Sequence, residues 1–151
     1  MRVLMVFTGL VLTLSSLAFA HCQVPCGIYD DQARLDAMAE NITTIERAMK
    51  MIGDLSDDAE PNHNQIVRWV EAKNHHADDI AHIVSWYFLQ QRVKPAGQSD
   101  AAAHEAYLQK LTLLHGMLVQ SMKAKQTTDL AHVRELRMLL DEFGKAYMAG
   151  K

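Results

Sequence analysis

The chain has 151 residues, of which 49% are hydrophobic and 22% are charged, a composition typical of one soluble globular domain. Its 15 Lys and Arg are spread among 18 Asp and Glu, for a formal net charge of −3, and neither sign forms a long run. A protein that binds nucleic acid is expected to carry a basic patch, so this balance argues against a nucleic-acid partner.

The first segment, residues 1–20, has the layout of a secretory signal peptide. Arg2 precedes an apolar stretch over residues 3–17, and the small-residue pattern Ala18-Phe19-Ala20 follows. This is the arrangement of a leader with an A-x-A cleavage site. An uncleaved membrane anchor is the alternative, but the apolar stretch is shorter than the ~20 residues that span a bilayer. We therefore expect residues 1–20 to be removed and the processed protein to have no membrane segment.

From Asp30 onward the hydrophobic pattern is helical almost throughout. Apolar residues three and four positions apart predict a helix that begins at Asp30 or Asp31, where a carboxylate can accept helix N–H bonds, and fades near Gly53. A second helix is predicted from Pro61, which suits a first turn, to the residues before Lys94. The predicted inward residues of the two helices are Leu35, Met38, Ile42, Ile45, Met49 and Ile52, then Ile66, Trp69, Val70, Ile80, Ile83, Val84 and Tyr87.

Two more helices complete the predicted fold. The third begins near Ser99 or Asp100, and the fourth is capped by Thr127 or Thr128. Their predicted inward residues are Tyr107, Leu111, Leu114 and Leu118, then Val133, Leu136, Leu140, Phe143 and Tyr147. Four long helices joined by short loops predict an all-α, up-down-up-down four-helix bundle over residues 30–151.

Both cysteines lie just past the predicted cleavage point, in the run His21-Cys22-Gln23-Val24-Pro25-Cys26-Gly27-Ile28-Tyr29, which we call the hook. In an exported protein a C-x-x-x-C pair by itself is most often a disulfide that closes a small loop. Cleavage after Ala20, however, would make His21 the first residue. A free amine, an imidazole, the Cys22 amide nitrogen and two thiolates would then lie within a single short segment.

These donors favour a particular class of metal. The amine and the Cys22 amide nitrogen form one five-membered chelate ring, and the same amide and the Cys22 sulfur form another. Fused rings enforce a planar set of donors, which suits Ni(II) or Cu(II) rather than zinc, because zinc prefers a tetrahedron. Copper usually binds more tightly, but paired thiolates tend to reduce Cu(II), so the donor set favours nickel.

The pattern His-Cys-x-x-Pro-Cys-Gly-x-Tyr at a processed N-terminus resembles the nickel-hook motif of the nickel superoxide dismutase family. The resemblance implies one nickel ion per subunit, cycling between Ni2+ and Ni3+, with superoxide as substrate. Its ligands would be the His21 amine, the Cys22 amide nitrogen, and the Cys22 and Cys26 thiolates, with the His21 imidazole axial in the oxidised metal. A homohexamer is implied as well.

Other residues acquire roles from the same resemblance. Tyr29 can place a phenol beside the open axial position, although packing at the head of a helix is the alternative. The family orients the axial imidazole with an acidic residue of the first helix, for which Asp36 is the nearest candidate. Gln23 departs from the acidic residue of many members, which leaves the hydrogen bonds around the mouth of the hook in doubt. The leader indicates a periplasmic or secreted protein, or a cytoplasmic one where a dedicated protease removes the leader.

The predicted function is therefore superoxide dismutation at a mononuclear nickel site. An exported nickel or copper carrier without enzymatic activity is the leading alternative, and an exported helical interaction domain with a Cys22 to Cys26 disulfide is another. A second constellation lies at ligand-like spacing on the second helix, but no matching pair appears on another helix, which favours solvated or interface histidines. Its members are Glu71, His75, His76, Asp79 and His82.

Overall fold

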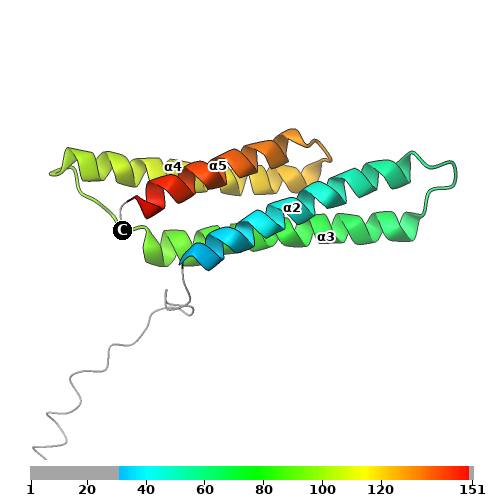
Figure 1. Cartoon of the computed structure of the whole chain (residues 1–151), viewed down its shortest axis with the longest axis horizontal. Helices are drawn as coiled ribbons and strands as arrows, with labels where there is room; N and C mark the ends of the chain where they lie inside the picture. Colours follow the sequence, from blue (N-terminus) through cyan, green and yellow to red (C-terminus); the bar gives the residue numbers. More distant parts are fainter. Residues whose placement is uncertain (1–30, 150–151) are drawn as a thin grey trace, which may run out of the picture.

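The computed structural model describes residues 31–149, which form a bundle of long antiparallel helices (Figure 1). In chain order these are α2 (Asp31–Ser56), α3 (His63–His82), α4 (Ala101–Gln126) and α5 (Ala131–Met148). A π-helix, η2 (Ile83–Arg92), continues α3 without a break. The predicted leader and the hook lie outside the described residues.

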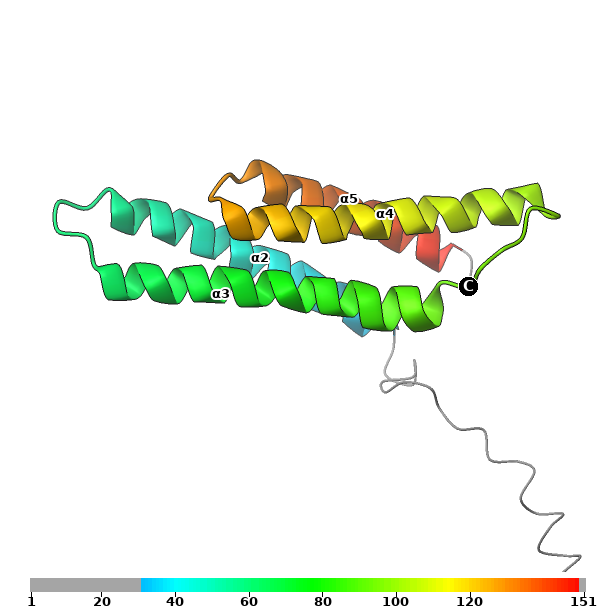
Figure 2. The same cartoon turned by 180° about the vertical axis from the view of Figure 1, so that it is seen from behind.

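Each helix packs against the next one along the chain, and α5 returns to pack against α2 (Figure 2). This arrangement confirms the predicted all-α four-helix bundle, and residues 31–149 contain no strand. No helix in this described range is long and apolar enough to cross a membrane.

Much of the core is formed by the apolar stripes that the periodicity predicts. The predicted Ile66, Trp69 and Val70 of α3, however, are only partly buried, as are three of the four residues predicted for α4, whereas Phe88, Leu113 and Met117 are buried without having been predicted. All six inward residues predicted for α2 are buried, and Met38, Ile42 and Ile45 are fully so. Burial of such side chains contributes about 25 cal/mol per Å² of apolar surface, which is why the stripes face one another. The second and fourth predicted stripes also supply core residues, among them Ile80, Val84, Tyr87, Val133, Leu136, Phe143 and Tyr147.

Local hydrogen bonds decide where the helices begin, and two of these starts differ from the predictions. Pro61 precedes the cap of α3 rather than occupying its first turn, because the Asn62 side chain accepts a bond from the Gln65 N–H at 3.2 Å. The N-cap position of α5 is Leu130, whose side chain makes no capping bond, so the helix does not begin at the predicted threonine cap. The Asp129 carboxylate just before it accepts from the Ala131 N–H at 2.8 Å. The start of α4 is as predicted, because the Asp100 carboxylate accepts from the Ala103 N–H.

Candidate metal centre

The residues predicted to hold the metal are adjacent in sequence to the described bundle. His21, Cys22, Cys26 and Tyr29 all fall within the hook, outside residues 31–149. The structure does show the element to which the hook is covalently joined. Asp31, two positions after Tyr29, is the first residue of α2. Asp31 is therefore the described residue nearest to the hook in sequence.

Asp31 lies in a buried polar cluster at this junction. Its side chain is only 2% exposed and forms an ion pair with Arg92 of η2. The Arg92 Nε donates to Oδ1 at 3.0 Å and Nη2 donates to Oδ2 at 2.8 Å, so the guanidinium binds the carboxylate with both arms. The Tyr87 hydroxyl donates to Oδ1 at 2.5 Å, and the Tyr147 hydroxyl donates to Oδ2 at 2.9 Å. These four residues are called the Asp31 cluster below.

The π-helical register of η2 brings two members of this cluster together. Tyr87 and Arg92 are five positions apart, and in an α-helix that spacing would separate their directions by roughly 140°. A π-helix bonds each residue to the fifth one along and has a wider turn, as in the bond from the Val93 N–H to the Phe88 carbonyl at 2.8 Å. Residues five apart therefore point to nearly the same side, and both reach the same carboxylate.

Aromatic packing fixes the rings that carry the two hydroxyls. The Phe88 ring is fully buried and meets the rings of Phe143 and Tyr147 edge-on, with centroids 4.9 and 5.3 Å away. Tyr147 also stacks on Phe143, and Tyr87 meets Phe88 edge-on. Such contacts between aromatic rings restrict their orientation. The hydroxyls that bind Asp31 thus belong to side chains held by the core.

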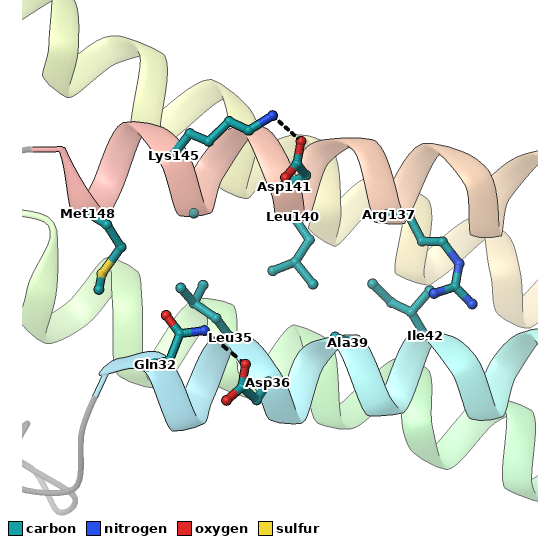
Figure 3. A pocket seen from close by; sticks show the side chains of 11 residues that line it. Gln32, Leu35, Asp36, Ala39, Ile42, Arg137, Leu140, Asp141, Lys145 and Met148 are labelled. Atoms are coloured by element: carbon teal, nitrogen blue, oxygen red, sulfur yellow. Dashed lines mark hydrogen bonds and ion pairs between the residues drawn. The ribbon is translucent and has the colours of Figure 1, made fainter.

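A groove between α2 and α5 runs beside this end of the bundle and has a volume of about 400 Å³ (Figure 3). Asp36, the candidate partner of the His21 imidazole, lies in this groove with its side chain exposed. Its Oδ1 accepts a hydrogen bond from the Gln32 Nε2 at 2.8 Å. Leu35, Ile42 and Leu140 supply apolar lining, whereas Arg137, Asp141 and Lys145 supply charge. Asp36 is therefore on an accessible surface within two turns of the start of α2.

Three histidines of the constellation on α3 contact different neighbours, although the rings of His75 and His76 also meet edge-on, with centroids 5.8 Å apart. His75 lies 3.5 Å from Asp79 as an exposed ion pair, whereas the His76 Nδ1 bonds to the Asn41 Oδ1 of α2 at 2.7 Å. His82 stacks on Trp86. Across residues 31–149, no group of three or more His, Cys, Asp or Glu side chains is placed to hold a metal ion.

Comparison with known proteins addresses the resemblance directly. The family model for nickel-containing superoxide dismutase matches residues 16–151. The chain belongs to this family. Searches of curated proteins and of solved structures gave no match. The matched range contains the hook and all the helices of the bundle, so membership of the nickel-containing superoxide dismutase family confirms the resemblance predicted from the motif.

Proposed function

We propose that the processed chain is a nickel-dependent superoxide dismutase that converts two superoxide ions and two protons into dioxygen and hydrogen peroxide. The observation that carries this proposal is the family match over residues 16–151, a range that includes the complete hook motif. Membership supports nickel and superoxide at the level of the family. The assignment of individual residues rests on the chemistry of the donors.

The donor set fits nickel. His21 would contribute its amine and imidazole, and Cys22 and Cys26 would contribute thiolates together with the Cys22 amide nitrogen. Soft sulfur and amide nitrogen in a tetragonal set suit a divalent metal of this kind better than zinc. Nickel bound by these electron-rich donors would supply one-electron redox chemistry in the range that superoxide requires.

The chain itself has three further tasks. Tyr29 is proposed to hold a phenol near the substrate, and Pro25 restricts one dihedral angle of the hook. Asp36 is proposed to accept a hydrogen bond from the His21 imidazole and so to orient that ring, the usual role of a carboxylate beside a metal-bound histidine. Its exposure in the groove between α2 and α5 supports this role, because an exposed carboxylate can be reached by a neighbouring segment.

Processing is part of the proposed function. The amine becomes a ligand only when residues 1–20 are removed, so the full chain is proposed to be an inactive precursor. Removal during export would give a periplasmic or secreted enzyme, and removal by a dedicated protease would give a cytoplasmic one. The processed subunits are proposed to form a homohexamer with one nickel ion each.

One experiment separates this proposal from its alternatives. Nickel analysis of the processed protein is combined with an assay of superoxide consumption. Bound nickel together with rapid consumption is expected. Bound nickel or copper without consumption would instead indicate a metal carrier, and the absence of both metal and consumption would indicate a helical interaction domain.

A further inference from the structure

We infer that the Asp31 cluster is a positioning site, in which the Asp31 carboxylate fixes where the hook leaves the bundle. This inference rests on the proposed function, because it assigns the cluster a role in presenting the hook for catalysis. The cluster joins Asp31, which is close to the hook in sequence, to Tyr87 and Arg92 of η2 and Tyr147 of α5, which are far from it. These four residues are offered as positioning residues and not as metal ligands.

Stability of the fold alone does not explain the Asp31 cluster. An acidic residue in the first turn of a helix interacts favourably with the helix dipole even where it stays exposed to solvent, so this gain does not require burial. The Asp31 residue is nevertheless buried, with 3% of its surface exposed. The Asp31 carboxylate of this ion pair is 2% exposed, whereas the Arg92 side chain is 29% exposed. Burial of the carboxylate carries a desolvation cost that offsets the attraction of the two charges, so apolar residues could serve stability as well. A buried carboxylate that accepts two hydrogen bonds from one guanidinium is, however, held in a defined orientation.

The location of the Asp31 cluster supports the same inference. It joins the first residue of α2 to η2 and to the last turns of α5, and these three segments meet at one end of the bundle (Figure 1). The Arg92 Nε also donates a hydrogen bond to the Tyr147 hydroxyl at 3.2 Å, so η2 and α5 are joined to each other as well as to Asp31. Helix ends usually fray, because their terminal backbone groups lack partners within the helix. This end is held by side chains from two other elements.

Only a short length of chain separates the Asp31 cluster from the hook. Tyr29 precedes Asp31 by two residues, which span at most about 7 Å even when fully extended. The position of Asp31 therefore limits where Tyr29 can lie. Small misplacements of a catalytic group can cost a large factor in rate. The π-helical register of η2 places Tyr87 and Arg92 on one side of the helix, where both side chains reach Asp31. π-Helical turns occur frequently at functional sites, which fits a positioning role for this one.

The test uses the processed protein with the variants Tyr147→Phe and Arg92→Lys. The first removes one hydroxyl and keeps the buried ring, and the second replaces a two-armed donor by a single point charge. Glu46→Gln is the matched control, because Glu46 and Arg137 also join α2 to α5 through an ion pair, at 2.6 Å, but much farther along α2 from the hook. None of these changes touches a proposed nickel ligand.

Two measurements are made on each protein. Hydrogen exchange of the reduced, metal-free form is followed at residues 32–40, where both cluster variants should exchange about tenfold faster than wild type or the control. The nickel-loaded forms are then compared by nickel content, by the nickel–thiolate absorption spectrum and by superoxide turnover per nickel. Nickel content should be retained, while the spectrum shifts and turnover falls about tenfold. A further variant, Arg92→Met, removes the charge altogether, and Arg92→Lys should keep more turnover than Arg92→Met.

Each cluster variant should show both faster hydrogen exchange in the metal-free form and a shifted spectrum with lower turnover in the nickel-loaded form. Exchange at wild-type rates in the two variants would overturn the inference, because α2 would then not depend on the cluster. Faster exchange with an unchanged spectrum and unchanged turnover would overturn it too, since the cluster would serve the bundle alone. If nickel-loaded wild type consumes no superoxide, the proposed function fails, and the exchange and the absorption spectrum still test the cluster separately.

Discussion

Replacing the buried Lys73 by methionine should destabilise the bundle, although it removes a buried charge. Lys73 of α3 is 3% exposed, and its Nζ donates to the carbonyls of Ala124 and Lys125 at 2.7 and 2.6 Å. These carbonyls belong to the last turn of α4, where backbone oxygens lack partners within the helix. A third bond reaches the Asn74 Oδ1 at 3.1 Å. The Lys73 side chain, which comes from α3, therefore caps the C-terminal end of α4.

The magnitude follows from two opposing effects. Burial, followed by repulsion from Lys125, lowers the pKa of Lys73 below 10.5, so keeping its charge inside the bundle is costly. Against this, hydrogen bonds from a charged donor contribute about 1.5–3 kcal/mol each, and a carbonyl left buried without a partner costs about 1–3 kcal/mol. Methionine has a similar length and leaves no large cavity. We expect Lys73→Met to lower the free energy of unfolding by about 2 kcal/mol.

Urea unfolding followed by circular dichroism measures this change, with protein concentration held constant because subunit association would add to stability. Lys123→Met is the matched control at an exposed site of the same helix end and should cost less than about 1 kcal/mol. Since the folded pKa of Lys73 is lowered, the folded state releases its proton first as the pH rises. The advantage of wild type over Lys73→Met should therefore grow as the pH approaches 10.5. A variant as stable as wild type would refute the reasoning.

Three further predictions concern the hook. One extra residue before His21 should abolish superoxide turnover without loss of helicity by circular dichroism, because it converts the amine ligand into an amide. His21→Gln should keep some nickel and lose most of its superoxide turnover, whereas Tyr29→Phe should keep nickel and lose about tenfold or less of its turnover. Similar losses of turnover in the two variants would argue against separate roles for the His21 ligand and the Tyr29 phenol. Removal of nickel should leave the circular dichroism spectrum unchanged, while thiol titration in air shows Cys22 and Cys26 closing slowly into a disulfide. Fresh, fully active protein that already contains this disulfide would contradict the site.

The helical stripes were predictable because each depends only on the 3.6-residue period of one segment. Leu35, Ile42 and Ile45 face the core, as their spacing indicates. Lys73 was not found this way, since a lysine at an inward position is normally read as polar. Its role depends on carbonyls about fifty positions away in the sequence. The start of α5 was predicted wrongly for a different reason: Thr127 and Thr128 have side chains suited to capping, whereas the N-cap position is Leu130, whose side chain makes no capping bond.

The hook motif was recognisable because its residues lie within one short segment, and the family match bears out the family that it indicated. The Asp31 cluster was not recognised, because it joins residues up to 116 positions apart. It also depends on a π-helical turn that has no periodic signal in the sequence. One signal was available: Tyr87 and Tyr147 were both predicted to face inward, and a buried tyrosine hydroxyl needs a hydrogen-bond partner.

The central claim is that the hook binds nickel through its two thiolates and thereby consumes superoxide. The most direct test is to measure nickel content and superoxide consumption in parallel for the processed protein that begins at His21 and for its Cys26→Ser variant. Wild type should contain nickel and consume superoxide. The variant should do neither, because a neutral hydroxyl cannot replace a thiolate donor, and its circular dichroism spectrum should match that of wild type. A folded Cys26→Ser variant that keeps both nickel and full activity would contradict the claim.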